Sequence, residues 1–313
     1  MQLSSLAVAS RSFSKHPVLR KEVLKRYPDA KFNDEGLWLK DGPLVNFLRG
    51  CEKAITGLEK IDKAILLQLP ELRVIGKYGV GLDMVDLQAM SNLGLKLGWT
   101  GGVNKRSVSE LVVSFAVALL HRAVYANAEV RSGKWNKIKG RQLSKCTVGV
   151  IGCGHIGKDV IRLLQPFQCK ILAHDIVVFK EFYEEYQVVP VGLMQLLEES
   201  DVITLHLPLD DSTENILSRE KLEMIKKDAV LINLARGGLV DELALEETLL
   251  AKKIAGAALD VFEIEPPIGK DFVNMENVFV TPHIGGSTEE AILAMGMAAI
   301  EGLENAKDPL EFL

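Results

Sequence analysis

The sequence predicts an α/β fold, with a doubly wound parallel sheet in one domain and a second, smaller α/β domain. Two observations lead to this prediction. From Thr147 onward, short β-branched runs alternate with amphipathic stretches, which is the pattern of strands joined by crossover helices in a parallel sheet. The chain is also 313 residues long, and at roughly 150 residues per domain this length indicates two domains.

Six apolar runs are expected to form the strands of the larger sheet. They are residues 147–151, 170–174, 201–207, 229–233, 254–259 and 277–281. Strands this apolar belong in a sheet that is covered on both faces. Helices are expected between them, and Ser218 or Asp241 can serve as an N-cap, each followed by a glutamate close to the positive end of its helix.

The first hundred residues alternate more weakly. Strands are expected near Leu6 and in residues 54–56, 73–77 and 95–97, with helices between them, which fits the smaller domain. Residues 107–123 are apolar on nearly every side, so we expect a helix buried between domains or against another subunit. Packing against another subunit would make the protein a homodimer.

Composition excludes several classes of partner. Lysine and arginine number 37 against 42 aspartate and glutamate, a net charge of −5 with no basic block, so nucleic acid is not an expected partner. No stretch approaches the ~18 to 20 apolar residues of a membrane span, and the N-terminal apolar run is too short for a signal peptide. The four cysteines show no CxxC spacing, which favours free thiols, no metal and a cytoplasmic location.

A glycine motif predicts the cofactor site. Gly152, Gly154 and Gly157 follow an expected strand and open a helix, so the glycines permit a tight turn, close approach of a pyrophosphate and close packing of helix on strand. The amides of His155 and Ile156 lie at this helix start and join the predicted site, whereas the side chains of Cys153 and His155 are expected to be a small filler and a surface ring.

Asp175 decides between the two nicotinamide cofactors. It ends the next strand, near the ~20-residue spacing expected of an acid that binds ribose. A carboxylate accepts hydrogen bonds from the free 2′-hydroxyl of NAD and repels the 2′-phosphate of NADP, so NAD is the predicted cofactor. The alternative is that the glycines only make a turn and Asp175 only begins a loop.

Three polar residues follow late strands and suit the reduction of a keto acid. Arg236 would hold a carboxylate and polarise a carbonyl, because its planar guanidinium is always charged. His283 would donate a proton near neutral pH, and Glu265 beside it would orient the imidazole and favour its protonated form. Spacing alone does not show that the three meet; a helix start, a solvated loop acid and a turn residue are the alternatives.

Several stretches together resemble one family, the D-isomer-specific 2-hydroxyacid dehydrogenases. They are KYGVGLDMVDL (77–87), GVIGCGHIGKDV (149–160), HLPLDDST (206–213), INLARGGLVDELAL (232–245), ALDVFEIEPP (258–267) and TPHIGGSTEEA (281–291). The resemblance implies that Arg236 contacts the substrate, that Glu265 orients His283, and that His283 is the acid/base. The activity implied is NAD-dependent interconversion of a small D-2-hydroxy acid and its 2-keto acid.

The same resemblance implies further site residues and the domain layout. The substrate would contact Tyr78, Gly79, Val80, Gly81, Asn104 and Arg236. The cofactor would also contact His206, Leu207, Pro208, Thr213, Ala235 and Asp260, the last through the nicotinamide carboxamide. A Rossmann NAD-binding domain would span residues 104–283, and a flavodoxin-like substrate-binding domain would combine residues 1–103 and 284–313, with hinges at the crossings that let the domains close and exclude water.

Within the family, residues 107–111 and 283–291 look most like the phosphoglycerate dehydrogenase branch. Members that act on phosphoglycerate usually carry a phosphate-binding arginine after an early strand, and the corresponding residues 55–60 have none. Lys60, Lys77 or Arg49 would have to replace it, so the substrate is left open, and glyoxylate or hydroxypyruvate reductase is an alternative. The chain as given carries no regulatory domain after the last helix, so inhibition by serine is not expected.

Rival functions differ in testable features. The corepressors called C-terminal-binding proteins share this fold and triad but use NAD as a sensed ligand, and turnover of a hydroxy acid discriminates them from an enzyme. Formate dehydrogenase would carry glutamine in place of Glu265. L-specific lactate and malate dehydrogenases usually place the glycine motif near the N-terminus, whereas here it begins at Gly152.

Overall fold

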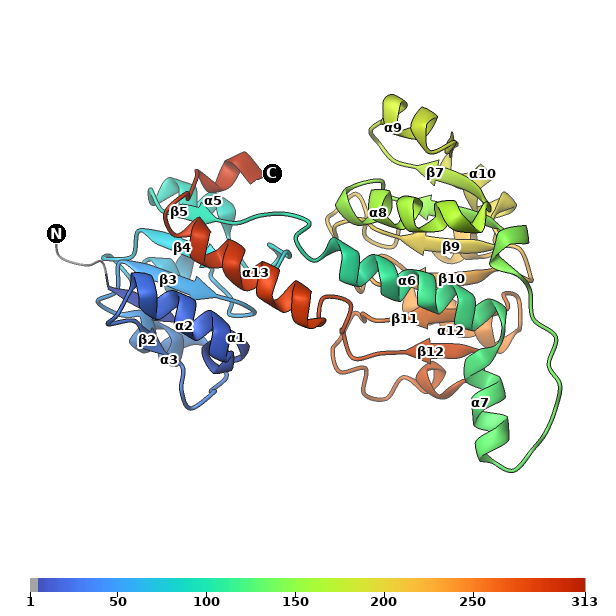
Figure 1. Cartoon of the computed structure of the whole chain (residues 1–313), viewed down its shortest axis with the longest axis horizontal. Coiled ribbons are helices and arrows are strands. Elements are labelled where there is room, and N and C mark those ends of the chain that lie inside the picture. Colours follow the sequence, from blue (N-terminus) through green and yellow to red (C-terminus); the bar gives the residue numbers. More distant parts are fainter. Residues whose placement is uncertain (1–4, 313) are drawn as a thin grey trace. The chain divides into compact units, whose positions relative to one another are not determined.

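The computed structural model describes residues 5–312, which form two compact units (Figure 1). Unit 1 comprises Met1–Asn104 and Glu289–Leu313, and unit 2 comprises Lys105–Thr288. Asn104 and residues 284–288 therefore fall on the other side of the expected boundaries. The first four residues, which begin the N-terminal stretch considered as a signal peptide, and Leu313 lie outside the described residues.

Unit 2 is built on a parallel sheet in the order β12-β11-β10-β9-β6-β7-β8. Its strands are β6 (Thr147–Ile151), β7 (Lys170–His174), β8 (Val189–Pro190), β9 (Val202–Leu205), β10 (Val230–Asn233), β11 (Gly256–Leu259) and β12 (Val278–Val280). The chain reverses its winding direction between β6 and β9, which is the doubly wound arrangement of the Rossmann fold. The predicted fold class is thus confirmed.

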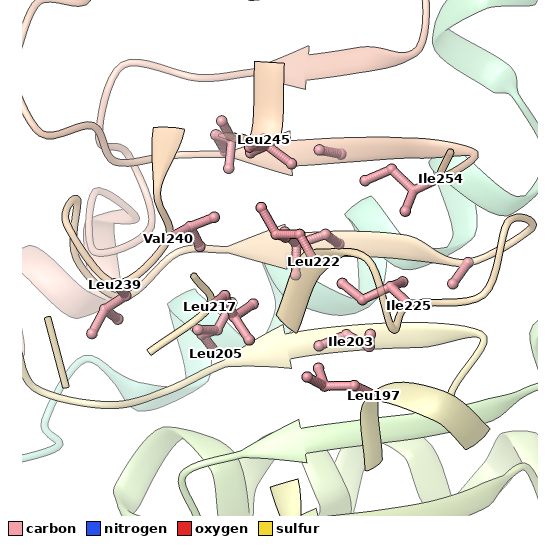
Figure 2. Packing of buried hydrophobic residues seen from close by; sticks show 14 of the residues in the cluster. Leu197, Ile203, Leu205, Leu217, Leu222, Ile225, Leu239, Val240, Leu245 and Ile254 are labelled. Atoms are coloured by element: carbon pink, nitrogen blue, oxygen red, sulfur yellow. The ribbon is translucent and has the colours of Figure 1, made fainter. Parts of the chain in front are cut away.

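Helices cover both faces of this sheet. The helices of unit 2 are α6 (Lys105–Leu120), α7 (Ala123–Arg131), α8 (His155–Leu164), α9 (Lys180–Glu185), α10 (Leu193–Glu199), α11 (Arg219–Leu222) and α12 (Glu242–Leu250), with short 3-10 turns at Leu143–Lys145, Gln165–Phe167 and Asp271–Asn274. Helix α7 packs chiefly against α6 and extends away from the sheet (Figure 1). Alternate side chains of each strand point to opposite faces, so Val148 and Val150 meet α6 and α8, whereas Ile151 faces the other layer. In that layer Ile203 and Leu205 of β9 belong to one core cluster with Leu222 and Leu245 (Figure 2).

The six predicted strands of unit 2 are confirmed, with ends that differ by no more than a few residues. The sequence did not predict β8, because it is two residues long and both of its side chains are exposed, so it leaves no apolar run. Asp241 is confirmed as an N-cap, since its carboxylate accepts a hydrogen bond from the amide of Ala244 at 2.9 Å. Ser218 occupies an N-cap position, but its hydroxyl donates to Glu220 at 2.7 Å and does not cap the helix.

The expected helix over residues 107–123 is wrong in its extent. Helix α6 ends at Leu120, and α7 begins at Ala123 after Arg122, which has a left-handed backbone with φ of 53°. The apolar character of α6 is accounted for largely inside unit 2, where it packs against α8, β10 and β11. Phe115 illustrates this packing, because its ring centroid lies 4.6 Å from that of Phe279.

Unit 1 contains a second parallel sheet, in the order β2-β1-β3-β4-β5 of flavodoxin-like folds. Its strands are β1 (Leu6–Val8), β2 (Lys31–Phe32), β3 (Lys53–Thr56), β4 (Val74–Lys77) and β5 (Lys96–Gly98). Its helices are α1 (Arg11–Lys15), α2 (Pro17–Arg26), α3 (Asp41–Leu48), α4 (Lys63–Leu66), α5 (Leu87–Asn92) and α13 (Glu289–Gly302), followed by a 3-10 turn at Pro309–Phe312. The four strands expected here are confirmed, and only the two-residue β2 was missed.

Helix α13 returns to unit 1 from the end of the chain and lies beside α2 (Figure 1). Its Ala299 and Ile300 are fully buried with Leu19 of α2 and Ile55 of β3 in one core cluster. Helices α3, α4 and α5 contribute the cluster on the other face of the sheet. Residues from both ends of the sequence thus share the core of unit 1.

Two further expectations concern membranes and cysteines. Among the described residues no single helix has the length and apolarity to cross a bilayer; α6 and α7 would meet those criteria only as a pair, bent by 64°. All four cysteines are free thiols. Among residues 5–312 no group of three or more His, Cys, Asp or Glu side chains is arranged to hold a metal ion.

Two leucines of α12 test the packing of the larger core. Leu245 is fully buried and Leu243 is 62% exposed, although they lie two positions apart on one helix. We expect Leu245→Ala to lower the free energy of unfolding by about 2–5 kcal/mol, because it leaves a cavity. The matched Leu243→Ala variant should change it by less than about 0.5 kcal/mol, since it creates none. Calorimetry on both variants checks this, and equal losses would contradict the packing described.

Candidate active site

The glycine loop lies at the carboxyl end of β6, at the point where the sheet reverses its winding. Gly152 has φ of +92°, and a Cβ there would lie 2.6 Å from the carbonyl oxygen of His206. A Cβ on Gly157 would lie 2.0 Å from the carbonyl oxygen of Gly152, so helix and loop pack as closely as expected. By contrast, nothing lies within 4 Å of a Cβ on Gly154, which is the N-cap of α8.

This arrangement fits the pyrophosphate of a dinucleotide. The open side of Gly154 leaves space where the first amides of a ten-residue helix lack intrahelical partners and where its dipole favours an anion. Cys153 is fully buried, and burial raises the pKa of its thiol to about 11, so its side chain fills space as expected. The His155 side chain is exposed, as expected of a surface ring.

Asp175 lies beside the glycine loop, immediately after β7. Its Oδ2 accepts a hydrogen bond from the amide of Cys153 at 2.6 Å, and its Oδ1 accepts one from the amide of Val177 at 2.8 Å. Each carboxylate oxygen can accept a further bond, so the side chain is held in place and still able to bind a ribose hydroxyl. A pocket of about 270 Å³ adjoins it, lined chiefly by apolar residues that include Val178 and Val191.

The loop after β9 carries the next predicted cofactor residues. The ring of His206 contacts the hydroxyl of Thr204 at 3.1 Å, and burial lowers the pKa of His206 to about 3, so this imidazole stays neutral and is unsuited to proton transfer. Leu207 lies against Gly152, its Cδ2 being 2.9 Å from the position of a Cβ there. Thr213 closes the turn by donating to the carbonyl of Pro208 at 2.8 Å.

Arg236 lies in the loop after β10. Its Nη1 donates to the carbonyl of Ala235 at 2.7 Å. Asn233, which is 3% exposed, holds the backbone of this loop through two hydrogen bonds. Its Nδ2 donates to the carbonyl of Arg236 at 2.8 Å, and its Oδ1 accepts from the amide of Ala235 at 3.0 Å. Sequence reasoning missed this positioning role, and the available signal was a polar residue that ends an apolar strand.

The structure brings Glu265 and His283 into contact. Nδ1 of His283 lies 2.9 Å from Oε2 and 3.1 Å from Oε1 of Glu265, and these contacts fix the orientation of the ring. The second ring nitrogen, Nε2, is then the atom that can exchange a proton with a substrate. The two side chains are 50% and 39% exposed, so substrate can reach them. His283 has φ of 54°, a strained conformation for a non-glycine residue of the kind found at functional sites.

Asp260 explains how this strained segment is held. The carboxylate is 1% exposed; its Oδ1 accepts from the hydroxyl of Thr281 at 2.5 Å and from the amide of Ile284 at 2.7 Å, and its Oδ2 accepts from the amide of Gly285 at 2.7 Å. These bonds flank His283 and tie Ile284 and Gly285 to β11 of unit 2. The expected contact of Asp260 with a carboxamide stays a prediction.

The predicted substrate residues of unit 1 follow β4. Gly79 has φ of +114°, and Nε1 of Trp99 donates to the carbonyl of Val80 at 3.1 Å, which holds the loop of residues 78–81 in place. The ring of Tyr78 packs edge-on against Phe13, and burial raises the pKa of Tyr78. Asn104 is 7% exposed, and among the described residues its Oδ1 has no hydrogen-bond partner.

Comparison with known proteins identifies the kind of domain that unit 2 contains. Residues 113–285 match the family model described as the NAD binding domain of D-isomer specific 2-hydroxyacid dehydrogenases. This match confirms the predicted resemblance and the predicted cofactor, NAD.

Two curated relatives are equally similar in sequence. The D-3-phosphoglycerate dehydrogenase of Methanocaldococcus jannaschii is 38% identical over 248 residues, covering 78% of this chain and 47% of that protein. The hydroxypyruvate reductase of Thermotoga maritima is 38% identical over 248 residues, covering 77% and 80%. The chain thus spans about half the length of the first relative and most of the second.

Solved structures resemble this chain over nearly its whole length. The TT0316 protein of Thermus thermophilus is 30% identical with a TM-score of 0.87, covering 98% of this chain and 97% of that one. A D-lactate dehydrogenase from Aquifex aeolicus, solved with NAD and lactic acid, is 25% identical with a TM-score of 0.83, covering 96% and 94%.

The position of Asp175 predicts the preference between cofactors. We expect Asp175→Ala to raise the Kd of NADH by about tenfold or more, because charge-assisted hydrogen bonds to the ribose are lost. The Kd of NADPH should not rise in parallel, because the carboxylate repels its 2′-phosphate. Fluorescence titration with both cofactors measures the ratio. Asp228→Ala, at the opposite edge of the sheet, is the control, and an unchanged ratio in Asp175→Ala would remove the ribose role.

Proposed function

Because the chain belongs to the D-isomer specific 2-hydroxyacid dehydrogenase family, we propose that it interconverts a small D-2-hydroxy acid and its 2-keto acid with NAD. The observation that carries the proposal is the contact of His283 with Glu265 at the same sheet edge as the glycine loop. The register supports this placement, since Asn233 pairs with Leu259 and Leu259 with Val280 across three adjacent strands.

His283 is the proposed proton donor. When bound, NADH supplies the hydride that reduces the keto carbon. Nε2 of His283 donates its proton to the keto oxygen, while Glu265 accepts the hydrogen bond from Nδ1–H and stabilises the charged imidazolium before the transfer. In the oxidative direction the same nitrogen removes the hydroxyl proton.

Arg236 is the proposed ligand of the substrate carboxylate. Its guanidinium is always charged and presents two parallel donors, which suits a carboxylate better than an ammonium does. Asn233 supports it by fixing the loop backbone on both sides of the arginine. In unit 1 we assign the amides of Gly79, Val80 and Gly81 to the same carboxylate group, with Tyr78 and Asn104 as further substrate contacts.

The remaining cofactor contacts are assigned by position. The amides of Gly154, His155 and Ile156 would hold the pyrophosphate, and the apolar pocket beside Asp175 would take the adenosine end. The other residues proposed to line the cofactor are His206, Leu207, Pro208, Thr213, Ala235 and Asp260. Unit 2 is accordingly the proposed NAD-binding domain, and unit 1 the proposed substrate-binding domain.

Oxidation of NADH with a panel of 2-keto acids tests the proposal. Glyoxylate, pyruvate, hydroxypyruvate and phosphohydroxypyruvate are the appropriate substrates, because relatives carry names that include D-3-phosphoglycerate dehydrogenase, hydroxypyruvate reductase and glyoxylate reductase. The proposal requires turnover of at least one of them, which is measured as the loss of NADH absorbance. Binding of NADH without turnover of any would favour a protein that senses NAD.

Removal of the proton donor should affect turnover more than binding. We expect His283→Ala to lower kcat by roughly 10²- to 10⁴-fold, the range typical of a lost acid/base, with little change in the Kd of NADH. Glu265→Gln should cost less, because an amide oxygen still accepts from Nδ1–H but carries no charge. Steady-state kinetics of both variants measures this. Undiminished kcat in His283→Ala would exclude the assignment.

Two further proposals concern oligomeric state and location: a homodimer that forms through the region of α6, and a cytoplasmic location. Leu111, Val113 and Val117 of α6 support the dimer, because they are only partly buried within unit 2. The four free thiols support the location, since reducing compartments keep cysteines in this form.

Light scattering measures the oligomeric state directly. A homodimer should have twice the chain mass of 34.5 kDa, and Ser114→Arg, which adds a charge at an exposed position of α6, should shift the protein toward monomer. The wild type as a monomer at micromolar concentration would contradict the proposed dimer.

A further inference from the structure

Trp99 holds one peptide unit of the loop that follows β4. Its indole Nε1 donates a hydrogen bond to the carbonyl of Val80 at 3.1 Å. A peptide bond is planar and trans, so the carbonyl of Val80 and the amide of Gly81 belong to one rigid unit and point in opposite directions. The bond from Trp99 therefore fixes the direction of the Gly81 amide without using that amide itself.

Lys77 holds a second peptide unit of the same loop. Its side chain is 4% exposed, and its Nζ donates to the carbonyl of Tyr78 at 3.2 Å and to the carbonyl of Gly57 at 2.8 Å. The Tyr78 carbonyl shares a peptide unit with the amide of Gly79, so this amide is oriented in the same way. The amides of Gly79 and Gly81 are two of the three donors assigned above to the substrate carboxylate, and each thus has a side-chain donor behind its peptide unit.

The segment after α13 fixes the strand that leads to Trp99. Leu97 of β5 and Lys307 exchange two backbone hydrogen bonds, of 2.9 and 3.0 Å, as an antiparallel bridge. Gly98 lies directly against the end of α13, because a Cβ there would be 2.2 Å from the carbonyl oxygen of Gly302. The two residues before Trp99 are therefore held by residues more than 200 positions later in the sequence.

The indole ring packs on the 3-10 turn that follows this bridge. The ring centroids of Trp99 and Phe312 are 5.3 Å apart and their planes meet at 73°, which is an edge-to-face contact. Asp308 anchors the turn, since its carboxylate accepts from the hydroxyl of Ser91 at 2.8 Å and lies 3.4 Å from Nζ of Lys96. The aromatic contact restricts the rotation of the indole and so helps to keep Nε1 directed at the loop.

We propose that Trp99 is a positioning residue for substrate binding, and that residues 307–312 hold it in place through Phe312. This inference rests on the proposed function and adds a residue that acts behind the same site. The indole keeps the Gly81 amide in one orientation, so less conformational freedom is lost when a carboxylate binds to it. The bond to the Val80 carbonyl also polarises the peptide unit, which makes its amide a stronger donor.

Trp99→Phe tests the role of the indole donor, because it removes Nε1 and retains an aromatic ring beside Phe312. We expect the KM for the preferred 2-keto acid of the panel to rise about three- to tenfold, the effect of about one lost hydrogen bond. The kcat should change by less than about twofold, since the lost interaction serves binding. The Ki of oxamate, a non-reacting analogue of pyruvate, should rise in parallel, whereas the Kd of NADH should not change.

Tyr27→Phe is the matched control. It also keeps an aromatic ring, and it removes a hydroxyl that accepts from Nζ of Lys53 at 2.9 Å. Lys53 begins β3, so this bond lies at the amino end of the sheet, opposite to the end from which the substrate loop leaves. The control should leave KM and the Ki of oxamate unchanged. Phe312→Leu keeps the indole but removes its aromatic support, and it should raise KM about twofold.

The outcomes separate this inference from the proposed function. A KM in Trp99→Phe equal to that of the control, or a loss of kcat at unchanged KM, would overturn the inference and leave the proposed function standing. A KM in Phe312→Leu equal to that of the control would remove residues 307–312 from the proposal. The absence of NADH oxidation by the wild type with every acid of the panel would overturn the proposed function and this inference with it.

Discussion

Parallel pairing of β10, β11 and β12 is the constraint on which the candidate site depends. Parallel strands end at one edge, so the loops that carry Arg236, Glu265 and His283 leave the sheet together although 47 residues of sequence separate the first from the last. The sheet is buried on both faces by helices, and its side chains are held at close packing. The backbone that carries the polar side chains at its edge is therefore rigid.

Buried polar side chains carry this rigidity from the strands into the loops. Asn233 ends β10 and Asp260 directly follows β11, and each satisfies backbone groups of a loop that bears a proposed functional residue. A buried carboxylate is costly unless it is well hydrogen-bonded, and Asp260 accepts three bonds from the segment around His283. The strained backbone of His283 is compensated in this way, while Glu265 contacts the ring itself.

The sequence alone was sufficient for the strands and the glycine loop, because both leave local patterns. Apolar runs mark β6 to β12 except the two-residue β8. The spacing of the glycines marks the loop, because a side chain at Gly152 or Gly157 would collide with the backbone. The sequence did not predict that α6 ends at Leu120, because the apolar pattern continues past Arg122, whose left-handed backbone separates α6 from α7. The hydrogen bond from the buried Lys77 to the carbonyl of Gly57 was also beyond it, because it depends on a loop brought close by tertiary packing. The role of Asn233 was missed although its contacts are local, because the sequence marks it only as a polar residue that ends an apolar strand.

The stereochemistry of the product tests the central claim most directly. The protein would be supplied with NADH and hydroxypyruvate, and the glycerate formed would be resolved by chiral chromatography. A dehydrogenase of this family, with His283 as proton donor, should form D-glycerate with stoichiometric oxidation of NADH. Formation of L-glycerate would contradict the account.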